Sequence, residues 1–145
     1  PADLHGRRIG QELEVFEVGM IDYAKYLIRK GWLKQPAYFN LLLGSLGTMN
    51  ASQNNLSYLV SQLPVFSIWS ASGVGRSHGL VRELAIKMGG GVRTGLEDSL
   101  YLDRDKQALA SNSDLIRQAL DAALRNGLEI ATPGEVRQWL EMAPP

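Results

Sequence analysis

The sequence has 145 residues, a length that suits a single domain covering 1–145. Its 15 basic and 15 acidic side chains cancel, and no basic stripe with interleaved aromatic residues points to nucleic acid. No apolar run approaches the roughly 20 residues that a membrane crossing needs. The absence of cysteine excludes disulfides and thiolate metal sites and favours a cytoplasmic protein. Because the chain begins at Pro1 without a methionine, we expect further residues upstream.

Strand and helix patterns alternate along the first half of the chain. Residues 12–20 alternate polar and apolar side chains, which is typical of a strand, and residues 21–31 carry apolar side chains at helical spacing. A nearly continuous apolar run at 37–44 predicts a strand that is buried on both faces. A helical stripe over 56–63 follows, and a proline ends it.

The same alternation continues in the second half. The remaining predicted elements are a strand at 65–70, a helix at 80–88, a strand at 92–97 and C-terminal helices at 113–126 and 133–142. Thr132, Pro133 and Glu135 have the spacing of a capping box with proline at the first helical position, so the last helix is expected to start there.

The predicted strands begin near residues 12, 37, 65 and 92, about 25–28 residues apart, which is the size of one strand–helix unit. Right-handed crossovers would make all of the strands parallel. This α/β pattern fits four consecutive βα units, half of an eight-stranded (β/α)8 TIM barrel that typically needs about 250 residues. The alternative is a flavodoxin-like sheet, which usually has about five strands in this length. The half-barrel is the preferred interpretation.

The segment 92–98 combines a short predicted strand with charged side chains. Because a strand alternates its faces, Arg93 and Glu97 share one face, with a glycine between them. Asp98 follows where the strand becomes a loop, and ligands bind at that edge of a parallel sheet. We therefore predict a polar pocket at this edge. The alternative is a solvated turn or a helix cap.

The residue types of this segment suggest specific roles. A carboxylate oxygen is a suitable zinc ligand, and a catalytic zinc needs three protein ligands and an open position, so Glu97 is a candidate metal ligand. Asp98 is a candidate acid–base group. Arg93 would keep Asp98 ionised, because a nearby cation favours the charged form of a carboxyl group.

Other candidates lie at the ends of the earlier predicted strands. Glu17 is closest to the C-terminal end of the first strand and is a candidate for the pocket, whereas Glu12 and Glu14 share the other face near the solvated start of the strand. The two histidines, His5 and His78, lack partners at metal-ligand spacing and are expected to be structural or to lie at the surface.

A glycine-containing loop follows each of the second and third predicted strands. In the loop around Gly75 and Arg76, backbone amides at a helix start and a forked guanidinium could bind an anion. Gly44 occupies a similar position after the preceding strand. A plain tight turn is the alternative for both loops.

From Val92 to Asp98 the sequence resembles the β-keto acid cleavage enzymes of the 3-keto-5-aminohexanoate cleavage type. The shared pattern is Gly-Gly followed by Val-Arg-x-Gly-Leu-Glu-Asp, and it continues here with Ser99-Leu100-Tyr101. Further similar segments are 14–19, Leu43-Gly44, Trp69, 73–76, 110–112 and 131–135. The resemblance spans essentially the whole chain, and its most specific element is the Arg-x-Gly-x-Glu-Asp pattern.

The resemblance implies a zinc-dependent (β/α)8 barrel that converts a β-keto acid and acetyl-CoA into acetoacetate and a new CoA thioester. By the same resemblance, Glu97 corresponds to the metal-binding glutamate, Asp98 to the catalytic aspartate and Arg93 to the arginine that acts with it. Glu17, Gly44, Gly75 and Arg76 would contact the substrate. The resemblance also implies a homo-oligomer, a tetramer.

One departure from the family pattern stands out. The family binds zinc with two histidines of a His-x-His element, and this sequence has none, so the remaining zinc ligands are expected outside this chain. Half the expected barrel length suggests the C-terminal half of a longer enzyme, with the missing N-terminal half as its partner. Two other functions stay open: a non-catalytic half-barrel that self-associates, and a barrel enzyme that binds a phosphorylated ligand through residues 73–76.

Overall fold

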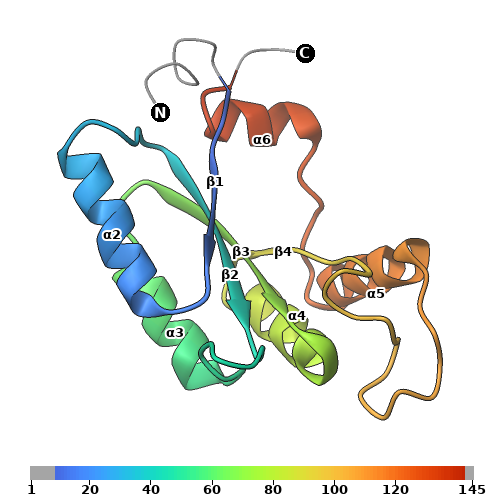
Figure 1. Ribbon diagram of the computed structural model, residues 1–145. Coiled ribbons are helices and arrows are strands. Elements are labelled where there is room, and N and C mark those ends of the chain that lie inside the picture. Colours follow the sequence, from blue (N-terminus) through green and yellow to red (C-terminus); the bar gives the residue numbers. More distant parts are fainter. Residues whose placement is uncertain (1–8, 143–145) are drawn as a thin grey trace.

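The computed structural model describes residues 9–142 and contains one parallel four-stranded sheet with the order β1-β2-β3-β4 (Figure 1). The strands are β1 (Glu12–Val15), β2 (Ala37–Leu43), β3 (Ser67–Gly73) and β4 (Gly91–Val92). A flavodoxin-like sheet changes direction in its strand order. The sequential order seen here is that of half of a (β/α)8 barrel, so the preferred interpretation of the sequence is confirmed.

The helices alternate with the strands. They are α2 (Val18–Arg29), α3 (Gln53–Gln62), the short 3-10 helix η1 (Gly75–Ser77), α4 (His78–Lys87), α5 (Asn112–Arg125) and α6 (Pro133–Trp139). Capping boxes start α5 at Ser111 and α6 at Thr132, as the sequence predicts for α6. Among residues 9–142, no helix combines the length and apolar character that a membrane crossing requires.

All four strands have bounds that differ from the predicted ones, although β2 only ends one residue early, at Leu43. The strand expected at 12–20 ends at Val15, because α2 begins at Val18. The strand expected at 65–70 runs over Ser67–Gly73, after Phe66 adopts a positive φ of 60°. The strand expected at 92–97 ends at Val92: Arg93 N still donates to Ala71 O, and the chain then turns away from β3.

The apolar core lies between the helices and one face of the sheet. Alternate strand residues, among them Val15, Phe39 and Ala71, point to this face and are at most 1% exposed. Helix residues that meet them include Ile21, Leu56, Leu59, Val81 and Ala85. Full burial of one large aliphatic or aromatic side chain stabilises a fold by about 1.5–3 kcal/mol, so this layer fixes the sheet on which the polar groups sit.

The opposite face of the sheet carries a chain of hydrogen bonds between polar side chains. Tyr38 Oη donates to Ser70 Oγ over 2.9 Å, Ser70 Oγ donates to Asn40 Oδ1 over 3.1 Å, and Asn40 Nδ2 donates to Glu12 Oε1 over 2.6 Å. Asn40 and Ser70 are each 1% exposed. This face corresponds to the interior of a (β/α)8 barrel, and its polar side chains lead toward the carboxyl ends of the strands.

Candidate active site at the carboxyl ends of the strands

Asp98 is a buried carboxylate with two polar partners. Its side chain is 4% exposed, and its Oδ2 accepts a hydrogen bond of 2.8 Å from Ser72 Oγ, at the end of β3. Arg93 Nε lies 3.2 Å from the same oxygen. Because a buried carboxyl group without polar partners is costly, Ser72 and Arg93 supply the contacts that its burial requires.

The turn after β4 brings this carboxylate into place. Gly95 O accepts hydrogen bonds from Asp98 N and Ser99 N, each 3.1 Å long, and Asn112 Oδ1 accepts from Leu96 N over 3.0 Å. Gly75 N donates to Asp98 O over 2.7 Å, which ties the turn to the loop after β3. Contacts from three segments, one of them made by the Asn112 side chain, therefore fix the position of Asp98.

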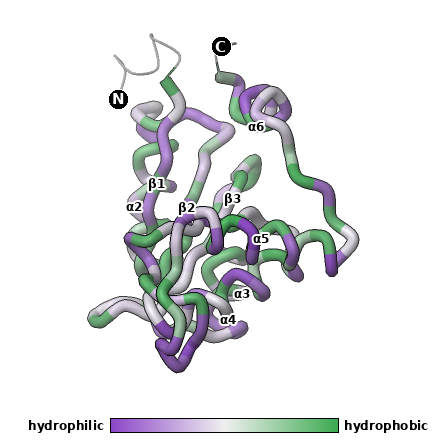
Figure 2. Tube along the Cα trace, turned by 90° about the vertical axis from the view of Figure 1, so that its right-hand side faces the viewer, coloured by the Kyte–Doolittle hydropathy of each residue, from purple (hydrophilic) through white to green (hydrophobic). Residues whose placement is uncertain are grey.

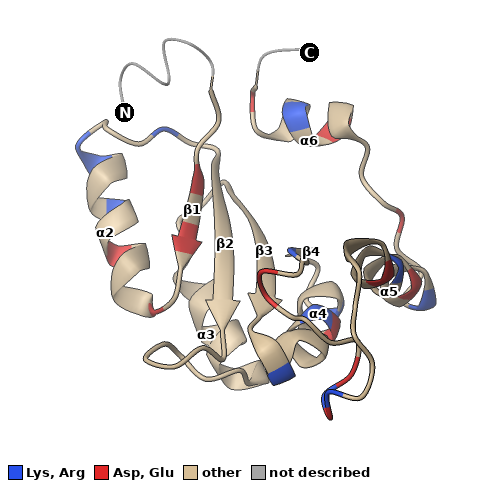
Figure 3. Ribbon diagram, turned by 45° about the vertical axis from the view of Figure 1, so that its right-hand side comes forward, with Lys and Arg blue, Asp and Glu red and all other residues tan. Residues whose placement is uncertain are grey.

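The Arg93 guanidinium joins three acidic side chains. It forms ion pairs with Asp98, with Glu14 on β1, and with Glu97 at 3.8 Å. Burial acts against the charged form, but the hydrogen bond with Glu14 and the neighbouring carboxylates raise the pKa of Arg93 above its usual value. The acidic residues of β1 and the charged residues after β4 lie on either side of β2 and β3 (Figure 3).

Glu14 and Ser72 are site residues that the sequence interpretation missed. Glu14 was expected near a solvated strand start, and its side chain is 49% exposed, but it also pairs with the Arg93 side chain, which reaches it across β2 and β3. Ser72 lies beyond the end of the strand predicted at 65–70, whereas in the structure it belongs to β3 and pairs with Leu42 of β2. The alternation of Glu12 and Glu14 on one strand face was the available signal for Glu14.

Glu97 lies beside this cluster but faces outward, with a side chain that is 60% exposed. Gly95 is buried next to the Glu97 carboxyl group, and a side chain at position 95 would collide with it. Within residues 9–142, no group of three or more His, Cys, Asp or Glu side chains could hold a metal ion. The described residues alone therefore do not fit a zinc site, which needs at least three protein ligands.

The predicted substrate-binding residues occupy the loops at the same edge of the sheet. Glu17 caps α2, because its Oε2 accepts a hydrogen bond of 3.0 Å from Gly19 N. Gly44 adopts a positive φ of 85°, and a side chain there would collide with Ser77. Gly75 also has a positive φ, of 58°, and is followed by the exposed Arg76. The structure thus brings Gly75 next to Asp98, while Glu17 belongs to the start of α2.

His78 is structural, in line with one of the two roles expected from the sequence. It starts α4, is 4% exposed, and its Nε2 lies 2.9 Å from Thr94 Oγ1 in the turn that leads to Asp98. His5 lies outside the described residues. Burial, followed by the charge of Arg82, lowers the pKa of His78, against a smaller opposing effect of Asp98. The imidazole is therefore neutral in the folded chain near pH 7.

We expect the chain to lose stability as the pH falls below about 6.5, the value of a histidine in the unfolded chain. Below that pH the unfolded chain binds a proton at His78 that the folded chain resists, so acid favours unfolding. Urea unfolding at pH 5.0 and pH 7.5 measures the difference. The variant His78→Gln should show a smaller pH dependence in this window, and an unchanged dependence would contradict the assignment.

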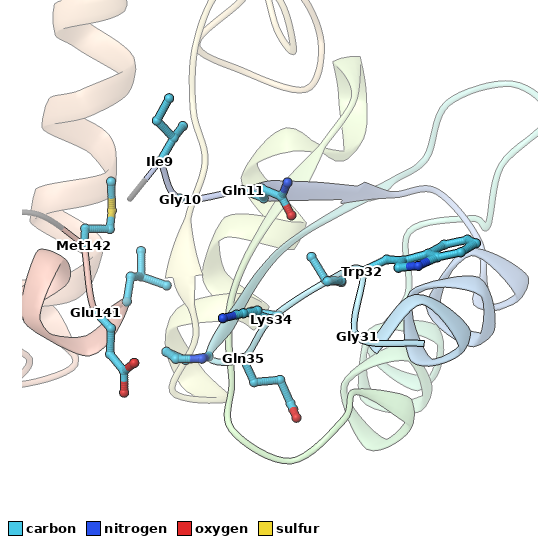
Figure 4. Close-up of a pocket in the computed structure, with 13 residues that line it drawn as sticks. Ile9, Gly10, Gln11, Gly31, Trp32, Lys34, Gln35, Glu141 and Met142 are labelled. Carbon is cyan, nitrogen blue, oxygen red and sulfur yellow. The ribbon is translucent and has the colours of Figure 1, made fainter. Parts of the chain in front are cut away.

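Two cavities adjoin the loops at this edge. One, of about 180 Å³, is lined by Glu97, Asp98 and the loop residues Val74 to Arg76, among others, and the second, of about 300 Å³, is lined by Arg76 and Arg104, among others. A third cavity, of about 300 Å³, lies at the amino ends of the strands, between the α2–β2 connection and the residues after α6 (Figure 4). Because active sites of (β/α)8 barrels lie at the carboxyl ends of the strands, we do not regard this last cavity as part of the active site. It is a gap in the packing beneath α6.

The comparisons with known proteins agree with this geometry. A model of the beta-keto acid cleavage enzyme family matches residues 2–142. The chain belongs to the β-keto acid cleavage enzyme family. The resemblance noted from the Arg-x-Gly-x-Glu-Asp pattern is thereby confirmed.

Curated members of the β-keto acid cleavage enzyme family match nearly the whole chain. A 3-keto-5-aminohexanoate cleavage enzyme of Fusobacterium nucleatum is 40% identical over 94% of this chain and 49% of its own length. The protein of the same name from Acetoanaerobium sticklandii is 36% identical over 89% and 47%. A 3-dehydrocarnitine:acetyl-CoA trimethylamine transferase of Rhizobium meliloti is 31% identical over 90% and 43%. The chain thus spans about half the length of the curated relatives it matches.

A solved structure supports the fold. ObcA, in a binary complex with oxaloacetate, superposes with a TM-score of 0.78 at 19% identity. The match covers 99% of this chain and 40% of the ObcA chain. At this identity the likeness concerns the fold, and it agrees with half of a (β/α)8 barrel.

Proposed function

We propose that this chain supplies the acid–base half of an acetyl-CoA-dependent β-keto acid cleavage enzyme. In the proposed reaction, a β-keto acid and acetyl-CoA give acetoacetate and a new acyl-CoA. The observation that carries the proposal is the buried Asp98 carboxylate, held by Ser72 and Arg93 at the carboxyl ends of parallel strands. Family membership and the acetyl-CoA transferase named among the relatives support the reaction class.

Asp98 has the properties of a proton carrier for this reaction. It would take a proton from the carbon between the keto and carboxylate groups, and the resulting carbanion attacks the thioester carbonyl of acetyl-CoA and releases the CoA thiolate. The thiolate attacks the original keto carbon, the carbon–carbon bond breaks, and the new acyl-CoA forms. The departing acetoacetate carbanion takes the proton back from Asp98, and this regenerates the Asp98 carboxylate.

Arg93 and Glu14 would act on this step through position and charge. Arg93 contacts the same Asp98 oxygen as Ser72, so the second oxygen stays available to a substrate. Glu14 holds the other end of the guanidinium and orients it. We propose Arg93 as the group that balances charge in the reaction and Glu14 as a positioning residue.

In this proposal, a zinc ion is bound partly by this chain and partly by residues outside it. The chemistry a bound Zn²⁺ supplies is polarisation of the keto oxygen. Because the described residues do not form a zinc site by themselves, we propose that Glu97 provides one ligand and that the others come from outside this chain. The substrate-binding roles of Glu17, Gly44, Gly75 and Arg76 also remain predictions.

The partner proposed for this chain is the other half of the barrel. The outer helices carry exposed apolar side chains: Tyr23, Tyr26 and Trp32 in and after α2, and Ile116, Leu120 and Leu124 on α5. Green and purple bands alternate along α5 in Figure 2. Exposed apolar faces of this kind mark association surfaces, and they flank the two edges at which a half-barrel is open.

A chimera tests the proposed function. This chain replaces the matching half of the Fusobacterium nucleatum relative, and acetoacetate release from 3-keto-5-aminohexanoate is measured with and without acetyl-CoA. We expect release that depends on acetyl-CoA. A folded chimera that fails to release acetoacetate, beside an active parent enzyme, would contradict the proposal.

The alternative function is a half-barrel that closes with a second copy of itself, which the exposed faces of α2 and α5 also allow. The mass of the isolated chain in solution, together with its metal content, distinguishes the two. A stable metal-free homodimer would favour the non-catalytic module.

A further inference from the structure

The segment between Asp98 and α5 is an ordered loop with two bonded arms. Leu102 N donates to Ala108 O over 2.9 Å, and Ala110 N donates to Leu100 O over 3.0 Å. Tyr101 forms an antiparallel bridge with Leu109. The sequence pattern predicts only a long polar loop here, because these backbone bonds leave no periodic signal.

Asp103 fixes the tip of this loop. Its carboxylate accepts hydrogen bonds from Asp105 N and Ala108 N at 2.9 Å and from Gln107 N at 3.1 Å. The bonds from Ala108 and Gln107 are the main reason that the pKa of Asp103 is lowered. The charge of Asp103 is thus satisfied inside the loop, and the fixed tip presents Arg104 and Lys106.

The loop tip faces the Gly75–Arg76 turn across two adjoining cavities. The cavity of about 180 Å³ runs from Asp98 to Lys106, and one of about 300 Å³ extends to Arg104. Both are lined by Gly75, Arg76, Ser99, Tyr101 and Asp103. Since Gly75 N donates to Asp98 O, the turn that carries Arg76 is joined directly to the proposed catalytic carboxylate.

Three cations surround these cavities without a carboxylate partner. Arg76 and Arg104 form no ion pair with any residue in the part of the chain that the structure describes. Lys106 Nζ lies 5.8 Å from the centre of the Tyr101 ring, a cation–π contact. Figure 3 shows the charged residues of the loop tip below α4 and α5.

We infer that Arg76, Arg104 and Lys106 bind the phosphate groups of the CoA thioester while its acyl end reaches Asp98, an assignment that rests on the proposed function. The thioester and the phosphates of CoA are separated by the pantetheine arm, so a site for both is elongated. The apolar wall of the inner cavity, which includes Val74, Leu96 and Leu100, suits that arm. Forked guanidinium groups suit the phosphates.

The test measures binding of CoA to the 145-residue chain by isothermal titration calorimetry. The double variant Arg76→Gln/Arg104→Gln should bind CoA about 10- to 100-fold more weakly, because about tenfold is expected for each charge-assisted contact that is removed. Arg117→Gln, which removes an exposed arginine of α5, is the matched control and should bind like the unmodified chain. Pantetheine, which lacks the phosphates, should bind equally to all three proteins.

Equal CoA affinity of the double variant and the unmodified chain would overturn the inference, as would the absence of CoA binding to the chain. Neither result bears on the acetoacetate assay, which tests the proposed function by itself. Conversely, a chimera could bind CoA through these arginines and still release no acetoacetate. In that case the proposed reaction would be wrong, and the inference about CoA binding would stand. The variant Asp98→Asn should retain CoA binding, which separates the two sites.

Discussion

Replacing Asp98 by asparagine is expected to lower kcat of the chimeric enzyme about 10³-fold, within the range typical of a lost general acid–base group. Asparagine has the same shape and can still accept a hydrogen bond from Ser72, but it cannot take up a proton at neutral pH. The variant should fold, because the surrounding turn is fixed by backbone bonds of Gly75 and Gly95. Acetoacetate release and the thermal midpoint are measured together.

The matched control for this variant is Asp121→Asn, which removes an exposed carboxylate of α5. It should leave both kcat and the thermal midpoint unchanged. Normal turnover of Asp98→Asn would refute the role given to Asp98. A collapse of the thermal midpoint in that variant would instead indicate a structural role.

Replacing Arg93 by methionine is expected to reduce kcat about 10²-fold and to lower the free energy of unfolding by about 2–3 kcal/mol. The change leaves the buried Asp98 carboxylate without its cation, and breaking a buried ion pair from one side is strongly destabilising. The expected loss in free energy of unfolding is smaller than for a fully buried ion pair, because the Arg93 side chain is 24% exposed. Turnover and urea unfolding measure the two effects.

Arg93→Lys and Arg117→Met are the comparisons for this prediction. Lysine keeps the charge but lacks the planar fork that reaches Glu14 and Asp98 together, so its kcat should fall between the wild type and Arg93→Met. Arg117 pairs with Asp114 on the exposed face of α5, so its loss should change stability by less than about 1 kcal/mol. Equal kcat for Arg93→Lys and the wild type would contradict the role of Arg93 as a bridge between Glu14 and Asp98.

Much of this fold could be predicted from the sequence because its signals are local. The buried run of β2 and the capping box at Thr132 each depend on residues that are close together in the chain. The same holds for the Arg93, Glu97 and Asp98 cluster, whose members fall within one turn. The prediction of their proximity was right, although they lie in a turn after β4 and not along a strand.

The rest of the site depends on contacts between distant segments. Glu14 meets Arg93 although β1 and β4 lie at opposite edges of the sheet, and Ser72 meets Asp98 because the turn folds back over β3. No periodicity within one segment reports such contacts. The end of β1 at Val15, by contrast, follows from a local contact, because Glu17 caps α2 two residues later by accepting from Gly19 N.

The central claim is that Arg93 and Asp98 work as one unit, and a double-mutant cycle on kcat tests it most directly. If the two act together, the double variant Arg93→Met/Asp98→Asn should lose about 10³-fold, no more than about tenfold beyond Asp98→Asn alone. A loss of about 10⁵-fold, the product of the two single effects, would show that the residues act independently and would contradict the account.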